Sequence, residues 1–218
     1  MGLKHSKQEQ QMCALVLGID GAGKTSALAR LCGEEVRTVM PTRGFTIRTL
    51  KIEGEAQLKL WDVSGKRELR TYWPEYFGVA QGLVYVIDAS DWRRMQESSA
   101  ELQRLLDRRE LLGVPLLVIA NKQDLPGALG ANEVEACLHL GAIRDRPWHC
   151  VACSALRKTG LAHGLQWLVE LHFADAERSE GARGARELPR VVTRSRAQPR
   201  ARRNLDAGSQ SNESDESD

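Results

Sequence analysis

Residues 14–31 read ALVLGIDGAGKTSALARL: a strand-length apolar run, a glycine-rich loop and the start of a helix-period segment. The loop, Gly18 to Thr25, fits the pattern G-x-x-x-x-G-K-[ST]. Its glycines let backbone N–H groups turn inward on phosphates at a helix N-terminus. Lys24 would hold the β- and γ-phosphates, and the Thr25 hydroxyl would ligate Mg²⁺. This predicts a nucleoside triphosphate site, with phosphate contacts from Asp20, Gly21, Ala22, Gly23, Lys24, Thr25 and Ser26.

Apolar runs of strand length recur along the chain, and segments with helical spacing of apolar residues lie between them. Runs without polar alternation are typical of strands buried on both faces of a parallel sheet. Strands that alternate with helices predict a doubly wound α/β domain. The strands are expected at residues 14–19, 83–87, 114–120 and 149–153, and the helices at 26–31, 95–112, 132–140 and 161–171.

Two segments do not fit this alternation of buried strands and helices. Residues 45–52 and 57–61 alternate apolar and polar side chains, and they flank the short turn Glu53-Gly54-Glu55. In the first segment the apolar positions include Phe45 and Ile47. Alternation on both sides of a short turn is typical of a β-hairpin, so we expect one at an edge of the sheet.

The motif Asn121-Lys122-Gln123-Asp124 directly follows an apolar strand, and open α/β sheets bind ligands at the carboxyl ends of their strands. The Asp124 carboxylate can accept from the ring N–H and the exocyclic amine of guanine, whereas adenine presents neither pattern there. Because a base other than guanine would leave this buried acceptor unpaired, the preference for guanine should be large, on the order of 10⁴. A backbone N–H after the last strand would reach the guanine oxygen. Guanine is therefore the predicted base, read by Asn121, Lys122, Asp124, Ser154 and Ala155.

Residues 61–65, Trp-Asp-Val-Ser-Gly, end the second strand of the hairpin. Asp62 suits the water shell of Mg²⁺, and the N–H of Gly65 can reach the γ-phosphate. Thr42 is placed to add a second hydroxyl to the metal. Because these contacts need the γ-phosphate or its metal, GTP should order both loops and GDP should release them. The predicted Mg²⁺ ligands are Thr25, Thr42 and Asp62.

Together these motifs resemble the ADP-ribosylation-factor and Arf-like (Arf/Arl) family of small GTPases, over residues 12–173. The resemblance rests on GIDGAGKT at 18–25, PTRGF at 41–45, WDVSG at 61–65 and NKQD at 121–124. Within the family, RTYWPEYF at 70–77, IRDRPW at 143–148 and CSAL at 153–156 look most like the Arf-like-three subgroup.

The resemblance implies a P-loop small-GTPase G domain, with a six-stranded, mostly parallel sheet, an antiparallel edge hairpin and flanking helices. It implies GTP/GDP and Mg²⁺ as cofactors, and an exchange factor and an activating protein as partners. Phe45, Trp61 and Tyr76 match the aromatic triad that the family offers to effectors; without the family, Phe45 could equally belong to the core. The subgroup implies effectors that are β-sandwich carriers of lipidated proteins, whose cargo the GTP form releases, often in cilia.

Two residues depart from the family pattern. Lys66 follows Gly65 where the family has a glutamine that orients the attacking water. An amide donates and accepts, whereas an ammonium only donates, so we expect slow intrinsic hydrolysis. Ser64 replaces the family's first glycine close to the γ-phosphate, with an effect whose sign the sequence does not indicate.

The two ends of the chain lie outside the predicted domain at 12–174. The extension at 1–11 begins MGLKHS, which fits an acylation signal at Gly2, so the N-terminus is either myristoylated or free. The tail at 175–218 contains nine arginines between Arg178 and Arg203 and then turns serine-rich and acidic. Such a composition predicts disorder, either as a solvated appendage or as a contact for lipid, a partner or RNA.

Whole-chain composition limits the remaining possibilities. The net charge is +2, which gives no reason to expect DNA binding. No apolar run approaches the roughly 20 residues that span a bilayer. We expect a cytoplasmic monomer with reduced thiols, bound peripherally to a membrane such as the Golgi or cilium if at all. Cys150 and Cys153 have C-x-x-C spacing, but such positions in a strand face opposite sides, which argues against redox or metal chemistry.

Two other functions fit parts of the pattern. A scaffold that stays loaded with GTP without hydrolysing it would explain Lys66. A P-loop kinase would explain the phosphate loop, but it would leave the Asn121 to Asp124 motif without a purpose.

Overall fold

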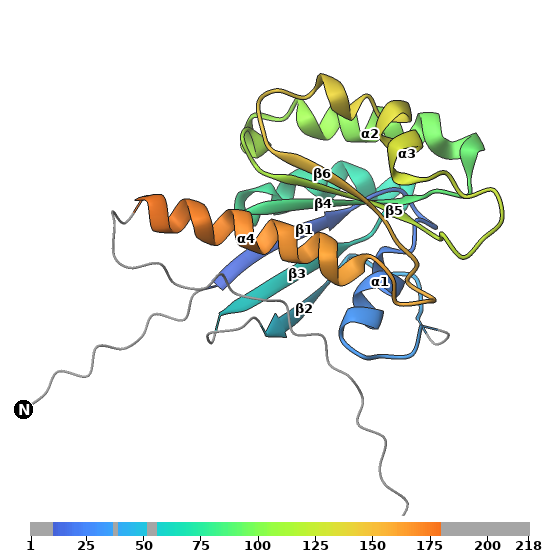
Figure 1. Cartoon of the computed structure of the whole chain (residues 1–218), viewed down its shortest axis with the longest axis horizontal. Coiled ribbons are helices and arrows are strands. Elements are labelled where there is room, and N and C mark those ends of the chain that lie inside the picture. The colour runs from blue at the N-terminus through green and yellow to red at the C-terminus, as the bar shows by residue number, and fades with distance from the viewer. Residues whose placement is uncertain (1–10, 37–38, 52–55, 180–218) are drawn as a thin grey trace, which may run out of the picture.

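The computed structural model describes residues 11–36, 39–51 and 56–179 (Figure 1). Six strands form one sheet in the order β2-β3-β1-β4-β5-β6. β2 is antiparallel to β3, and the other neighbouring strands are parallel. This confirms the predicted mostly parallel sheet with its edge hairpin. The strands are β1 (Gln11–Leu17), β2 (Phe45–Lys51), β3 (Gln57–Val63), β4 (Gly82–Asp88), β5 (Leu116–Asn121) and β6 (Trp148–Ala152).

Helices cover both faces of the sheet, α1 and α4 on one face and α2 and α3 on the other (Figure 1). Alternate residues of β1 serve the two faces: Ala14 and Val16 pack under α1 and α4, whereas Leu15 and Leu17 pack under α2 and α3. The helices are α1 (Lys24–Leu31), α2 (Met95–Leu106), α3 (Ala131–Cys137) and α4 (Leu161–Ser179), with 3-10 helices η3 (Arg67–Val79), η4 (Trp92–Arg94), η5 (Arg109–Leu111) and η6 (Leu140–Ala142).

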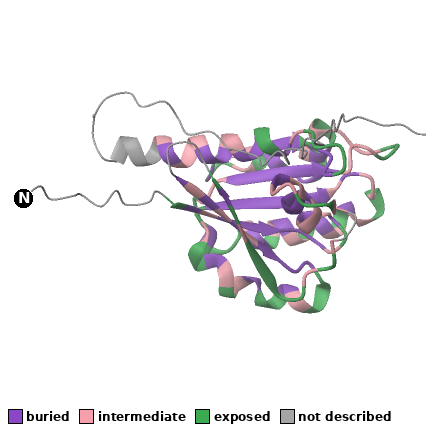
Figure 2. Ribbon diagram, turned by 90° about the horizontal axis from the view of Figure 1, so that it is seen from below, coloured by how far each residue is buried: buried purple, intermediate pink, exposed green. Residues whose placement is uncertain are grey.

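Strand β2 is an exposed edge of an otherwise buried sheet (Figure 2). Phe45 and Ile47 are 46% and 42% exposed, although they form the apolar side of its alternation. Leu50, on the opposite face, is buried with Leu58 under the α1 side of the sheet. The hairpin therefore presents apolar side chains on its outer face instead of burying them.

Two predicted helices end earlier than their apolar spacing suggested. The helix expected at 95–112 ends at Leu106, because a further turn would bring Arg108 and Arg109 onto the buried face that carries Leu102 and Leu105. The chain instead turns so that Leu111 becomes buried. Similarly, the helix expected at 132–140 stops at Cys137, and His139 then adopts a left-handed backbone with φ 57°.

Helix α4 extends past residue 174, where the sequence predicts the boundary between domain and tail. It continues to Ser179, so residues 175–179 are helical. Among the residues whose side chains are described, Phe173 is the last buried one, 6% exposed, and the following residues include good helix formers such as Ala and Glu. The rest of the predicted tail, 180–218, and the acylation signal at Gly2 lie outside the described residues. Among the helices of the described part, none is long and apolar enough to cross a membrane.

The two cysteines of the C-x-x-C pair, Cys150 and Cys153, pack on opposite faces of the sheet. Cys150 packs on the side of α2 and α3, and Cys153 packs on the side of α1 and α4, as their spacing in an extended segment predicts. Burial raises the pKa of both thiols to about 12. Neither thiol is therefore suited to redox or metal chemistry in the folded protein.

We predict that iodoacetamide at pH 8 alkylates exposed Cys137 first and leaves Cys150 and Cys153 unmodified in the native protein, because both are buried and remain protonated. Peptide mass spectrometry of a time course measures this order. Alkylation in urea is the control and should modify all five cysteines. Early modification of Cys150 or Cys153, or a disulfide between them, would contradict the assignment.

Candidate nucleotide-binding site

A cleft of about 300 Å³ opens beside the carboxyl ends of β1 and β3. Its walls come from the phosphate loop, the segment before β2 and the segment after β3, which brings together residues far apart in the sequence. Lys24, Lys66 and Lys122 all line it, so the cleft carries positive charge that suits phosphates. The predicted site residues on its walls are Asp20, Gly21, Gly23, Lys24, Thr25, Ser26, Thr42, Gly65, Lys66 and Lys122.

The phosphate loop has the backbone that the glycine pattern predicts. Gly23 has φ 88°, and a Cβ there would lie 2.4 Å from the Asn121 side-chain nitrogen. Lys24 is 6% exposed and donates to the carbonyls of Gly18 at 2.7 Å and Ile19 at 2.9 Å. Burial lowers the pKa of Lys24 to about 8. A phosphate placed beside this ammonium would favour its charged form.

The phosphate contact of Asp20 stays a prediction, and its side chain contacts two arginines. Its carboxylate accepts from Arg94 at 2.8 Å and from Arg70 at 3.0 Å. The hydrogen bond from Arg94 is the main reason that the pKa of Asp20 is lowered. Arg70, buried in η3, also pairs with Glu97 of α2. Asp20 therefore fastens the phosphate loop to η3 and to the start of α2.

The three predicted Mg²⁺ ligands lie together. The hydroxyls of Thr25 and Thr42 are 2.8 Å apart, and Thr42 donates to Asp62 Oδ2 at 3.3 Å. Asp62 is fully buried, and its Oδ1 has no hydrogen-bond partner among the described residues. Burial raises the pKa of its carboxyl group. Hydroxyl and carboxylate oxygens are the ligands that Mg²⁺ prefers. The carboxylate oxygen without a hydrogen-bond partner offers the negative charge that a cation requires, so these residues fit the ion.

The peptides of Ser64 and Gly65 are oriented by hydrogen bonds that the sequence did not predict. Trp73 Nε1 donates to the Ser64 carbonyl at 2.9 Å, from a side chain buried in the core. Because C=O and N–H point oppositely in a trans peptide, the N–H of Gly65 points away from that core, toward the cleft. Arg70 Nε donates to the Gly65 carbonyl at 2.9 Å. A Cβ on Gly65 would lie 2.3 Å from the backbone carbonyl oxygen of Gly18, which explains the glycine.

The predicted base-reading residues meet at the carboxyl ends of β5 and β6. Asn121 is buried and donates from Nδ2 to the Ala22 carbonyl at 2.9 Å, which ties the base motif to the phosphate loop. Lys122 has φ 68° and pairs with Asp88. The hydroxyl of Ser154 donates to the Asp124 carboxylate and so fixes the acceptor that would read guanine.

The predicted N–H contact from Ser154 or Ala155 to the guanine oxygen stays a prediction. Ser154 N–H donates to the Thr159 carbonyl at 3.1 Å, and Ala155 N–H donates to Asn121 Oδ1 at 3.1 Å. The second bond holds the Asn121 side chain, because the segment folds back on the base motif.

The predicted effector triad forms one aromatic cluster on the exposed hairpin. The ring of Phe45 stacks on Trp61 with centroids 5.4 Å apart, and it lies 5.3 Å from Tyr76 of η3. Trp61 and Tyr76 are half-buried, so only Phe45 of the three is largely exposed. The alternative that Phe45 belongs to the core is wrong. The cluster begins three residues after Thr42 and includes the neighbour of Asp62, so it adjoins two predicted metal ligands.

Comparison with known proteins agrees with this geometry. Residues 2–172 match the model of the ADP-ribosylation factor family. The chain is 48% identical over 169 residues to ADP-ribosylation factor-like protein 3 of Chlamydomonas reinhardtii, covering 78% of this chain and 94% of that one. It is 44% identical over 166 residues to ADP-ribosylation factor-like protein 2 of Drosophila melanogaster, covering 76% and 90%.

A solved structure shares the fold. The Arl6 BBS3 small GTPase of Trypanosoma brucei, determined with the nucleotide analogue GppNp bound, is similar with a TM-score of 0.69 and 27% identity. The match covers 76% of this chain and 99% of that one. Family model, relatives and fold all agree with the phosphate loop, the base motif and the switch segments, and the chain belongs to the ADP-ribosylation factor family of small GTPases.

Proposed function

We propose that this protein is a guanine-nucleotide switch that engages effectors through the Phe45, Trp61 and Tyr76 cluster when GTP and Mg²⁺ are bound. The observation that supports it most is the position of this cluster: Trp61 precedes Asp62 in β3, and Phe45 starts the strand that follows Thr42. Any movement of the two metal ligands on loss of the γ-phosphate would therefore move the aromatic surface. The effector class that we propose is a β-sandwich carrier of lipidated proteins.

We further propose that intrinsic GTP hydrolysis is slow. Lys66 is exposed on the wall of the cleft, directly after Gly65. Its ammonium can donate to a phosphate but cannot accept from the attacking water. When bound, Mg²⁺ would neutralise charge on the transferring phosphoryl group. The chain's own residues then hold the phosphates and orient Gly65. Among the described residues that line the cleft, none carries an amide side chain that could replace the missing glutamine.

Lys66 also supports the alternative function, a scaffold that stays loaded with GTP. The two functions differ in how the bound nucleotide is removed. A switch requires that an activating protein restore hydrolysis, for instance with an arginine worth about 10³ to 10⁵ in rate. The nucleotide content of freshly purified protein, with and without candidate activating proteins, separates them.

Replacing Lys66 with glutamine should speed hydrolysis at least about tenfold, because an amide both donates to and accepts from the attacking water. Single-turnover hydrolysis of preloaded GTP measures this. Lys66→Ala is the matched control: it removes the ammonium without adding an amide, and its rate should stay close to that of wild type. Equal rates for wild type and Lys66→Gln would sink the proposal.

Replacing Phe45 with alanine should weaken binding of a purified β-sandwich carrier at least about tenfold, because Phe45 is the most exposed member of the aromatic cluster. Calorimetry with GppNp-loaded protein measures the affinity. Trp92→Ala is the control, since Trp92 is 71% exposed but lies outside the cluster. Equal binding by the GDP-loaded and GppNp-loaded forms would contradict the switch.

Replacing Asp124 with asparagine should reverse the base preference. Asparagine offers an N–H₂ donor that pairs with the C2 carbonyl of xanthine, whereas the aspartate accepts from the amine of guanine. We expect GDP to bind at least about a hundredfold more weakly and XDP more tightly. Competition against fluorescent GDP and XDP measures both affinities, and an unchanged preference for guanine would show that Asp124 does not read the base.

A further inference from the structure

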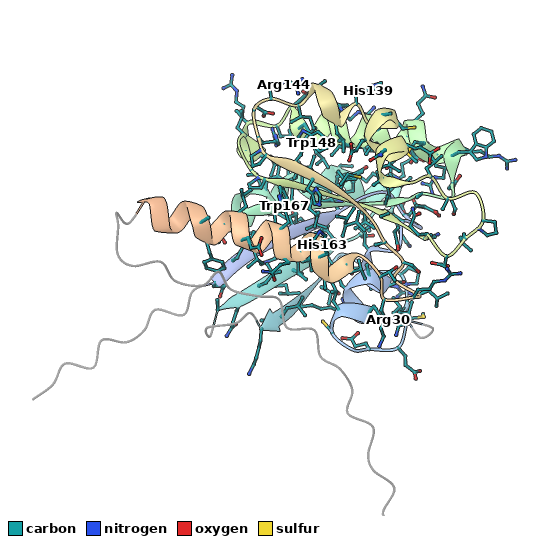
Figure 3. All side chains as sticks on the ribbon, viewed as in Figure 1. Arg30, His139, Arg144, Trp148, His163 and Trp167 are labelled. Carbon is teal, nitrogen blue, oxygen red and sulfur yellow. The ribbon has the colours of Figure 1, made fainter. Side chains whose placement is uncertain are left out.

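We propose that Arg30 is a positioning residue that closes a ring of hydrogen bonds around the nucleotide site and thereby slows guanine-nucleotide release. Arg30 lies on α1, the helix that continues the phosphate loop, and is labelled in Figure 3. Its Nε donates to the Ala155 carbonyl at 2.9 Å, and its Nη2 donates to the Leu156 carbonyl at 3.2 Å. The inference rests on the proposed binding of a guanine nucleotide.

The ring joins segments that are remote in the sequence. From the phosphate loop, the Ala22 carbonyl accepts from Asn121, and Asn121 Oδ1 accepts from the N–H of Ala155. The carbonyl of Ala155 accepts from Arg30, and α1 leads from Arg30 back to Lys24, two residues after Ala22. Figure 1 shows the segment between β6 and α4 beside α1. The ring thus consists of three hydrogen bonds, helix α1 and the short backbone segment from Ala22 to Lys24.

Arg30 suits this role because its guanidinium group is planar and carries several N–H donors in fixed directions. Two N–H groups of one guanidinium reach two successive carbonyls, which a single lysine ammonium cannot do with the same geometry. The contact to Ala155 is partly buried, where a hydrogen bond from a charged donor contributes more than on the surface. Holding both carbonyls fixes the orientation of the Ala155 and Leu156 peptides.

The ring also reaches the base acceptor. Ser154, the residue before Ala155, donates to the Asp124 carboxylate and accepts from the N–H of Arg157 at 3.0 Å. If the segment loses its anchor on α1, Ser154 no longer holds Asp124 in one orientation. Arg30 thus controls Asp124 without contacting it, and loosening the ring should affect recognition of the guanine amine as well as the lifetime of the complex.

The test uses the full chain and fluorescent GDP. Wild-type protein must first bind GDP; failure at that step would reject the proposed function and not the role of Arg30. Arg30→Ala should then release GDP between about tenfold and a hundredfold faster, the loss expected for hydrogen bonds from a charged donor. Its preference for GDP over IDP, which lacks the exocyclic amine, should fall. Single-turnover hydrolysis of bound GTP should stay within about twofold of wild type, because no reacting group is touched.

Two further variants separate positioning from general loosening of the fold. Arg30→Lys should restore only part of the slow release, because it keeps the charge but not the planar guanidinium group. Arg144→Ala is the matched control, since its guanidinium also donates to two backbone carbonyls, those of Gly141 and Ile143, but outside the ring, and it should release GDP at the wild-type rate. Wild-type release from Arg30→Ala, equal acceleration by Arg144→Ala, or an unchanged GDP-to-IDP preference would each overturn the proposal.

Discussion

The carboxylate of Asp62 is completely buried at the end of β3, and the arrangement of the switch segments depends on it. A buried charge must be compensated, and among the described residues the compensation is incomplete: Thr42 donates to one oxygen, Arg48 lies 3.7 Å from the same oxygen, and the other has no hydrogen-bond partner. Burial accordingly raises the pKa of the group. The Mg²⁺ that we propose here would remove this cost, so nucleotide and metal binding would also favour the fold.

The same constraint would couple the edge hairpin to the nucleotide in the proposed switch. β2 pairs with β3 so that Thr46 lies opposite Asp62 and Ile47 lies opposite Trp61. Residues on one face of this pair approach the metal ligands, whereas those on the other face form the exposed aromatic cluster. A shift of β2 along β3 would change both faces at once, since register in a sheet is shared by all its side chains. Phe45 and Ile47 lie exposed on this edge strand, so a shift of β2 would displace the surface that we propose engages effectors.

Much of the site could be predicted from the sequence because its contact residues are contiguous. The phosphate loop and the base motif each follow a buried strand, and the parallel sheet brings their ends to one edge. Residues that act through tertiary contacts could not be found this way. Trp73, Arg70 and Arg30 act on backbone carbonyls supplied by other segments, and no periodicity marks such partners. Helix ends were missed for a related reason, since burial of Leu111 decided where α2 stops.

The two halves of the site contribute differently to switching. The base side, with the ring through Asn121 and Arg30, is proposed to contact the guanine base, which GDP and GTP share, so it should hold both nucleotides alike. Only differential contacts shift a conformational equilibrium, and our proposal assigns those to Thr42, Gly65 and Lys66, which line the cleft. An ammonium at the position of Lys66 adds attraction for the extra charge of GTP even though it cannot orient water. The slow hydrolysis that we propose for Lys66 and this attraction for the triphosphate would therefore bias the proposed switch in the same direction.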